Sequence, residues 1–546
     1  MFRYRSALVT GIMLFAAAAT SLAVAAPTAN KAAIKAHLNF LADDLLEGRE
    51  TGSRGYDIAA GYVAAQLAQY GVAPKGDKGG FLQTVPLRST RLVPGSAVVE
   101  LHSPAGVERL SDATDFVMAG SALEDKSSVD APMVFVGYGI RSERFKHDDY
   151  ANVDVKGKIV VVLQGKPTRF PTEEGAHFGS TSEKSKLAAQ QGAVGIVTLW
   201  TPITEKTTGF AKLIKNNLFP GMVWLDAAGK PARAVPGMQG SVNLSMPAAK
   251  KLFSRTDVKL DDIYALAAAN KPIAALDLKL SMRMSKSSTR ADLKSSNVVG
   301  MIEGSDPRLK HEYVVLSAHL DHIGQVKEKT GDNIYNGAMD NASGIATLLE
   351  TARLFSQSGV KPKRSILFVA LTAEEKGLLG SDYFASNPTV PAGSMVANVN
   401  LDMPLLTYDF KNVIAFGADH SSLKNSATRA LGKMGLSLMA DPWPAMGIFT
   451  RSDHYSFVRQ GVPSIFLVTG FGSFNKNENG EKLWEEFQAR HYHQPSDDLN
   501  LPFNFDAAAR FAQLNYNIAL EIANAQEKPT WNKGDFFGDT FKKAAN

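Results

Sequence analysis

The sequence predicts an α/β fold whose mostly parallel central sheet carries helices on both faces, together with a β-rich domain inserted into the chain. Short, continuously apolar segments alternate with helical periodicity after residue 297, which is typical of strands buried on both faces. Strand-like segments separated by turn residues dominate residues 91–274. The length of 546 residues also exceeds what one hydrophobic core usually supports.

The first residues have the composition of a secretory signal peptide. Arg3 and Arg5 precede an apolar segment at 7–18, and small residues follow at 23–26. We therefore expect residues 1–26 to be a signal peptide that is cleaved, and the protein to be exported, to the periplasm or beyond in a bacterium. An uncleaved anchor is the alternative, but the apolar segment is short for one.

Two amphipathic helices are expected next. Apolar residues recur at helical spacing over 31–46 and again over 57–70, where the pattern stops at Gly71 and Pro74. The glycine-rich polar segment 46–55 between them is either a plain connector or a loop packed near a functional site.

The inserted domain is assigned to residues 91–274. It contains few residues with catalytic chemistry, and His147 and His177 stand alone in polar segments where we expect them to be solvated. The main domain is therefore discontinuous, comprising residues 27–90 and 275–546. Within residues 275–288, apolar residues alternate with polar ones from Leu276 to Met284, which predicts a long strand that leads back into the main domain.

The main domain shows strands alternating with helices. Because ligands gather beyond the carboxyl ends of parallel strands, polar residues that directly follow these strands are the candidates for a functional site. The predicted strands are 298–302, 313–318, 365–371, 396–401, 413–416 and 464–468, and the predicted helices are 343–359, 377–386, 421–435 and 507–525.

Five residues of metal-ligand type follow these strands or stand at the ends of helices. The chain has no cysteine, so any metal must be held by His, Asp and Glu. Two histidines and three carboxylates suit Zn²⁺, without excluding Co²⁺ or Mn²⁺. We therefore predict a hydrolytic site that holds two metal ions, one carboxylate being shared between them. The five predicted ligands are His319, Asp340, Glu375, Asp402 and His493.

The adjacent acids Glu374 and Glu375 follow an apolar strand. Neighbouring side chains diverge, so Glu375 can bind metal while Glu374 faces the attacking water as general base. A solvated pair in a loop is the alternative. Asp321 lies two residues after His319 and could orient its imidazole as a hydrogen-bond acceptor behind the metal ligands.

Three assignments stay open on spacing alone. Asp340 stands in a tight turn at a helix start, where it could share its carboxylate between two cations or simply cap the helix. His491 and His493 lie in one loop, and spacing does not distinguish them. Asp453 and His454 could line a substrate pocket or begin a helix.

The site segments resemble the M28 family of zinc aminopeptidases, in the secreted subgroup with an inserted protease-associated (PA) domain. Segments 134–140 and 155–162 also resemble the opening strands of a PA domain, which is non-catalytic in that family. The motifs that carry the M28 resemblance occur in the family's order at residues 318–322, 335–344, 373–381, 400–403 and 492–497.

This resemblance implies a zinc exopeptidase-like fold and two Zn²⁺ ions as cofactors. It assigns His319, Asp340 and Asp402 to one ion. It assigns Asp340, Glu375 and His493 to the other, and it makes Glu374 the base, in agreement with the reasoning above.

The predicted function is that of an exported dinuclear zinc aminopeptidase acting on peptides. A carboxypeptidase or dipeptidase of the same fold is the alternative, but binding a substrate carboxylate favours an arginine cluster and only Arg451 lies near a site motif. A glutaminyl cyclase with a single zinc, or a metal-free binding protein resembling transferrin receptors, fits the full ligand set less well. A net charge of +5 gives no reason to expect nucleic acid, and no membrane association is expected after signal cleavage.

Overall fold

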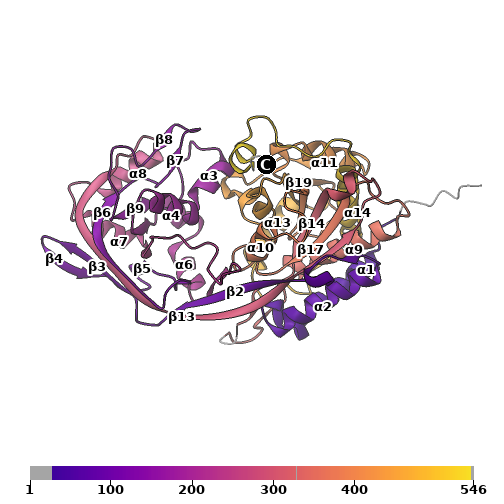
Figure 1. The fold of residues 1–546 in the computed structure, drawn as a ribbon, viewed down its shortest axis with the longest axis horizontal. Helices are drawn as coiled ribbons and strands as arrows, with labels where there is room; N and C mark the ends of the chain where they lie inside the picture. The colour runs from indigo at the N-terminus through magenta and orange to yellow at the C-terminus, as the bar shows by residue number, and fades with distance from the viewer. Residues whose placement is uncertain (1–26, 327–328, 543–546) are drawn as a thin grey trace, which may run out of the picture.

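The computed structural model describes residues 27–326 and 329–542 of the chain (Figure 1). The predicted signal peptide, residues 1–26, lies outside the described residues. Within the described ranges, no helix combines the length and apolarity needed to cross a membrane.

One long strand joins the two lobes of the molecule (Figure 1). The first part of β13 (Leu276–Ile302) pairs antiparallel with β3 (Val98–Ser103) and β6 (Lys126–Phe135) in the inserted lobe. Its second part pairs antiparallel with β2 (Leu82–Leu92) and β17 (Ser365–Leu371) in the main lobe. The two strands predicted at 275–288 and 298–302 are therefore one continuous strand that belongs to both sheets.

The main sheet has a parallel centre, as predicted. Strand β14 (Tyr313–His319) pairs parallel with β17 on one side and β18 (Met395–Leu401) on the other, and β18 pairs parallel with β21 (Ser464–Thr469). Every residue of these four strands is buried. Strand β19 (Asn412–Phe416) continues the sheet antiparallel to β21, so the sheet is mixed at its borders.

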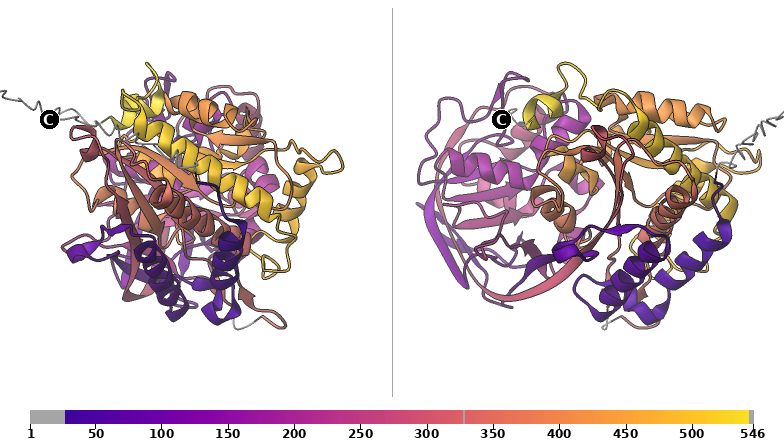
Figure 2. Two further views of the ribbon diagram at one scale, coloured as in Figure 1. Left: turned by 90° about the vertical axis from the view of Figure 1, so that its right-hand side faces the viewer. Right: turned by 45° about the vertical axis from the view of Figure 1, so that its right-hand side comes forward.

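Helices cover both faces of this sheet, because successive residues of each strand point to opposite sides. Val314 and Leu316 of β14 pack into one apolar cluster with helices α1, α9 and α14, whereas Val315 packs into another with α10 and α12. In the left view of Figure 2 the long yellow helix α14 crosses the outer face near α9 and the indigo α1. The α-helices of this lobe are α1 (Lys31–Leu41), α2 (Arg54–Gln69), α9 (Ser343–Gln357), α10 (Leu379–Ser386), α11 (Leu423–Gly432), α12 (His454–Val458), α13 (Gly480–Arg490), α14 (Phe505–Asn524) and, within the described residues, α15 (Phe536–Phe541).

The inserted lobe has its own sheet and its own apolar core. Its central strands β6, β9 (Ile159–Leu163), β10 (Gly195–Leu199) and β12 (Gly240–Leu244) pair parallel with one another. This lobe contains more helix than its turn-rich sequence suggested, and the helices are α3 (Thr172–Gly179), α4 (Thr181–Gln190), α5 (Pro202–Thr207), α6 (Phe210–Asn216), α7 (Met246–Phe253) and α8 (Leu260–Ala268).

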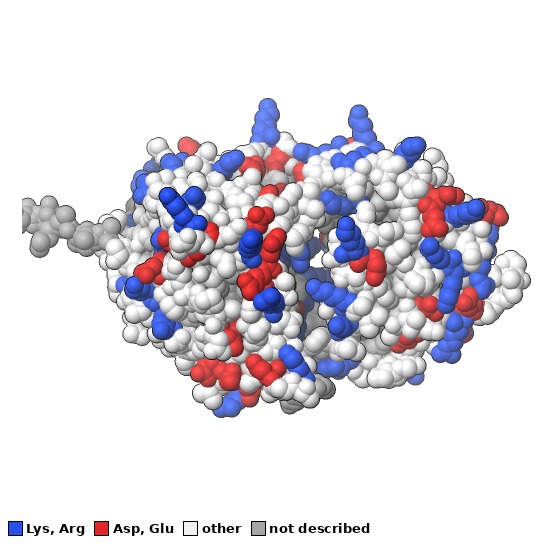
Figure 3. Space-filling model, turned by 180° about the vertical axis from the view of Figure 1, so that it is seen from behind, with Lys and Arg blue, Asp and Glu red and all other residues white. Residues whose placement is uncertain are grey.

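Figure 3 shows acidic and basic side chains interspersed over the face seen from behind, with a hollow near its middle. No single sign of charge dominates this face. The picture agrees with the small net charge of +5, which gave no indication of a nucleic-acid surface.

Helix α3 docks the inserted lobe onto the main lobe, and it overturns one expectation. His177 was expected to be solvated, but its side chain is buried and its Nδ1 lies 2.7 Å from the hydroxyl of Tyr455 in the main lobe. His147 is also not freely solvated, since its Nε2 lies 2.9 Å from Asp149. Both segments are polar locally; the partner of His177 is distant in sequence, whereas the carboxylate partner of His147 is only two residues away.

A second contact at this junction joins three segments through one imidazole. His420 Nδ1 lies 2.5 Å from Asp535, and its Nε2 pairs with Glu173 at the start of α3. Burial alone would lower the pKa of His420, but the two carboxylates outweigh it and raise the pKa to about 10. The imidazolium is therefore the form that holds the two lobes together at neutral pH.

We expect this contact to stabilise the fold below about pH 6.5, where histidine is protonated in both states, and to lose its effect as pH rises to about 10. Replacing Glu173 by Gln should lower the free energy of unfolding by about 2 kcal/mol at pH 6. The difference in melting temperature from the unaltered protein should shrink between pH 7 and pH 10. An equal difference at pH 6 and pH 10 would contradict this assignment.

Candidate metal centre

The structure brings all five predicted metal ligands together at the carboxyl ends of the parallel strands. His319 ends β14, Glu375 follows β17, and Asp402 follows β18. Asp340 lies in the turn that precedes α9, and His493 lies in the loop between α13 and α14. Segments far apart in the sequence therefore converge on one point at the sheet edge, as the sheet topology requires.

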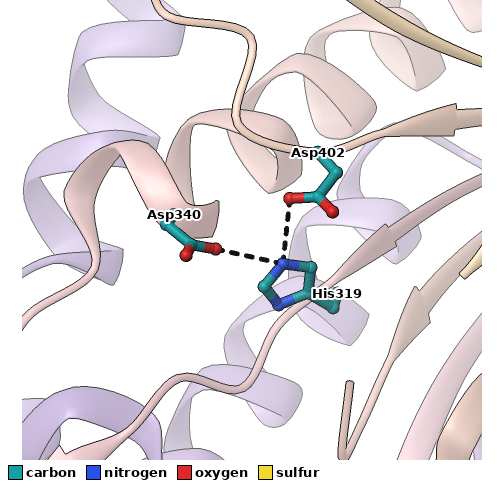
Figure 4. Close-up of side chains that lie close together, drawn as sticks. All are labelled: His319, Asp340 and Asp402. Atoms are coloured by element: carbon teal, nitrogen blue, oxygen red, sulfur yellow. Dashed lines mark hydrogen bonds and ion pairs between the residues drawn. The ribbon is translucent and has the colours of Figure 1, made fainter. Parts of the chain in front are cut away.

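The first group of ligands surrounds His319 (Figure 4). Its Nε2 lies 3.2 Å from Asp340 Oδ1 and 3.1 Å from Asp402 Oδ1. All three residues are buried, and their ligand atoms lie within 4.8 Å of one another. Its Nδ1 is 3.0 Å from the main-chain oxygen of Asp321, so Nδ1 carries the proton and Nε2 is free to bind a cation.

The second group surrounds His493 and uses the other oxygen of Asp340. His493 Nε2 lies 3.2 Å from Asp340 Oδ2 and 3.2 Å from Glu375 Oε2. Zinc bonds of about 2.0–2.2 Å in a tetrahedron place neighbouring ligand atoms about 3.3–3.6 Å apart. The observed separations of 3.1–3.2 Å are slightly shorter than that, and the single carboxylate of Asp340 faces both groups.

His491, which spacing could not distinguish from His493, lies outside the cluster. Its Nδ1 contacts Ser496, 3.0 Å from the hydroxyl. The other alternative for Asp340 also fails, because helix α9 begins after Ala342 and has no side-chain cap bond. Asp340 instead belongs to a turn whose main chain is held by Asp497, which accepts from the N–H groups of Met339 at 2.8 Å and Asp340 at 3.0 Å.

His322 is a residue at the centre to which the sequence reasoning gave no role. It is completely buried, and its Nδ1 lies 2.7 Å from Glu375 Oε1. With Asp340 and Glu375 it forms a second set of atoms close enough to hold an ion. The available signal was its place in the segment 318–322, three residues after His319.

The electrostatics of the centre also suit cations. Burial alone would raise the pKa of Glu375, but His493 and His322 outweigh it and lower the pKa to about 2. Burial would lower the pKa of His493, but Glu375 and Asp340 raise it to about 10. Divalent cations would neutralise these buried carboxylates and would displace protons from the imidazoles, so the donor set fits a metal pair.

Glu374 diverges from Glu375 and lines the cavity beside the ligands. Burial raises the pKa of Glu374 well above its ordinary value. The positive charge of His319 lowers this pKa, whereas the negative charge of Glu375 raises it further. A carboxyl group with a raised pKa can both accept and return a proton near neutral pH.

Asp321 acts on the centre in a different way from the one expected. Its main-chain oxygen, rather than its carboxylate, contacts His319. Its carboxylate accepts from the N–H groups of Glu374 at 3.0 Å and Glu375 at 3.3 Å. Asp321 therefore fixes the turn that makes the two glutamates diverge.

A cavity of about 280 Å³ opens directly beside the ligands. Asp453 and His454 do not line it; both are fully buried next to it, and Asp453 makes no cap bond to α12. Burial raises the pKa of Asp453 to about 7. The cavity wall is mostly apolar and includes Met403, Phe416, Trp443, Met446, Ile448, Phe466, Val468 and Trp484, together with the polar Arg451, Glu485 and Gln488.

Comparison with known proteins agrees with this geometry. Residues 297–519 match the sequence pattern of Peptidase family M28, and residues 125–213 match that of the PA domain. Transferrin receptor protein 1 from Gallus gallus is 25% identical over 413 residues, which are 68% of this chain and 47% of that protein. Aminopeptidase Y from Saccharomyces cerevisiae is 28% identical over 233 residues, 41% of this chain and 38% of that protein.

The chain thus spans about half the length, or less, of these curated relatives. The solved structure of an aminopeptidase from Aneurinibacillus sp. strain AM-1 shares the fold, with a TM-score of 0.51, 18% identity, and coverage of 92% of this chain and 95% of that one. The chain therefore carries a region of the Peptidase family M28 type at residues 297–519, with a PA domain ahead of it at residues 125–213.

Proposed function

We propose that this protein is an exported dinuclear zinc aminopeptidase that removes N-terminal residues from peptides. One observation carries the proposal: the two oxygens of Asp340 each lie 3.2 Å from the Nε2 of a different histidine, His319 or His493. The similarity of this chain to aminopeptidase Y supports aminopeptidase activity. Export rests on the composition of residues 1–26.

In this proposal residues 27–90 and 275–546 form the peptidase domain, and residues 91–274 form the PA domain. The continuous pairing of β13 with both sheets supports a rigid attachment of the two.

The ligands divide between the two ions. His319, Asp340 and Asp402 would hold one Zn²⁺, whereas Asp340, Glu375 and His493 would hold the other. Bound there, the ions would supply a nucleophilic water at neutral pH and polarise the carbonyl of the scissile bond.

Glu374 would move the proton that this reaction requires. Its carboxylate faces the same cavity as the ligands, and burial keeps its pKa high. It would take a proton from the attacking water and deliver it to the amine of the leaving peptide.

The cavity supports an apolar side chain at the substrate N-terminus. Met403, Phe466 and Ile448 form part of the cavity wall. A polar side chain placed against them would lose its hydrogen bonds to water and gain none from the wall, which costs free energy. A carboxypeptidase or dipeptidase remains the alternative, and Arg451 at the cavity is the observation in its favour. A single arginine offers weaker recognition of a substrate carboxylate than a cluster does.

Peptide and arylamide substrates test the assignment. We expect leucyl and phenylalanyl arylamides with free amines to be cleaved, and the same compounds with acetylated amines to be cleaved at least 100-fold more slowly. Activity should vanish after chelation and return with Zn²⁺. Release of C-terminal residues, or equal cleavage of the blocked substrates, would favour the alternative and exclude an aminopeptidase.

A further inference from the structure

The glycine-rich loop 46–55 between α1 and α2 packs directly against the metal centre. Gly48 lies so close to the ligand-bearing segments that an added Cβ would meet the main-chain oxygens of Tyr335 at 2.4 Å and Gly324 at 2.7 Å. The backbone there also has φ of +68°, which favours glycine. The loop is therefore part of the structure behind the site rather than a plain connector.

Arg49 in this loop is buried, with a relative exposure of 1%, and all its bonds go to main-chain oxygens. Its Nε donates to Leu320 at 2.9 Å, the residue directly after His319. Its Nη1 and Nη2 donate to Asn336 at 2.6 Å and Gly337 at 3.0 Å, in the turn that leads to Asp340. One guanidinium thus bonds both of the loops that carry the first two ligands.

The planar geometry of guanidinium makes this arrangement restrictive. Its N–H donors point in fixed directions. Because they donate to the main-chain oxygens of Leu320 and Gly337 at the same time, they fix the distance between these two segments. A lysine at this position would keep the charge, but its single ammonium cannot reproduce the fork.

The two residues after Arg49 extend the same contact to the third ligand loop. Thr51 donates its hydroxyl to Asp321, at 3.1 Å, and Asp321 holds the main chain of the Glu374–Glu375 turn. The carboxylate of Glu50 lies 3.0 Å from the ammonium of Lys376, directly after Glu375. Residues 49–51 therefore contact the loops of three of the five ligands, His319, Asp340 and Glu375, directly or through Asp321.

Charge supports the same role. Burial lowers the pKa of Arg49 to about 10, against the opposing effect of nearby carboxylates that include Asp497, Asp321 and Asp340. Arg49 thus stays cationic at neutral pH and offsets part of the negative charge of the ligand set.

We propose that Arg49 is a positioning residue, whose guanidinium holds the loops of His319 and Asp340 at the cation-binding separation before a cation arrives. The inference rests on the proposed metal centre. Arg49 touches neither substrate nor metal in this account, and it acts only through the main chain of the ligand loops.

Arg364 offers a matched control. It is equally buried, at 1% exposure, and it donates to the main-chain oxygens of Ile522 and Ala525 and to the carboxylate of Glu312, at the other end of the sheet. Arg49→Lys and Arg364→Lys therefore remove comparable buried bonds, one behind the metal centre and one away from it.

Two measurements on metal-depleted protein test the proposal: zinc affinity by competition with a chromophoric chelator, and amide hydrogen exchange of residues 319–322 and 336–341. Arg49→Lys should weaken zinc binding about 10- to 100-fold and speed exchange in both segments. Arg49→Met should do so more strongly. Arg364→Lys should lower the melting temperature while leaving zinc affinity and exchange in these segments unchanged.

Unchanged zinc affinity and exchange in Arg49→Lys, with only a lowered melting temperature, would overturn the proposal. If Arg49→Met does not fold, Arg49→Lys decides alone, because it keeps the cation and most of the volume. Failure of the unaltered protein to bind zinc would refute the metal centre itself, and the exchange comparison would still test whether Arg49 orders the loops.

Discussion

Replacement of Asp340 by alanine is expected to strip both metal ions from the protein and to abolish peptidase activity. Each oxygen of this carboxylate faces a different histidine, so the substitution removes one ligand from both sites at once. We expect zinc affinity at each site to fall by more than about 100-fold, since even changes to residues behind the ligands cost 10- to 100-fold. Metal analysis after dialysis against zinc-free buffer measures this directly.

Asp402→Ala is the matched control for that result. Asp402 lies 3.1 Å from the Nε2 of His319, and its other oxygen accepts from the hydroxyl of Ser452, so it belongs to the His319 group and not to the His493 group. Its loss should weaken one site and leave the other, so about half of the bound metal should remain. If Asp340→Ala instead keeps as much metal as Asp402→Ala, Asp340 is not shared between two cations.

The second large effect is expected from replacing Glu374. Unlike Asp340→Ala, this change should leave the bound metal in place and lower the catalytic rate. Glu374 belongs to neither ion-binding group in the described part of the chain, yet it lines the cavity beside them. Glu374→Ala and the isosteric Glu374→Gln should therefore keep both metal ions, while kcat falls about 100- to 10,000-fold through loss of the proton acceptor.

Steady-state kinetics and metal analysis of the same preparations separate these effects. KM should change little, because Glu374 acts on the attacking water rather than on substrate binding. Loss of metal in the Glu374 variants together with full metal in Asp340→Ala would reverse the roles assigned to the two residues.

The fold class followed from sequence because buried parallel strands are mostly apolar. All residues of β14 and β17 are buried, and their largely apolar segments are visible without a structure. The continuity of β13 was not visible in the same way. Residues 285–296 are mostly polar, so the sequence gives no strand signal there. In the structure this part of β13 pairs with β2 as a partly exposed ribbon, and no buried face requires apolar residues to alternate with polar ones.

The candidate site was predictable to the extent that strand ends mark it. His319 and Asp402 each stand at the end of a buried strand, where a polar residue is informative. His493 lies in an irregular loop beside His491, and only tertiary packing or family resemblance separates the two. His322 and Arg49 act through contacts with residues far along the chain, and no local pattern reports such contacts.

The most direct test of the central claim is anomalous X-ray diffraction at the zinc edge from crystals of the zinc-loaded protein. We predict two peaks about 3.5–4 Å apart, on either side of the Asp340 carboxylate. One should lie beside His319 and Asp402, the other beside His493 and Glu375. A single peak, or two peaks that do not share Asp340, would contradict the account.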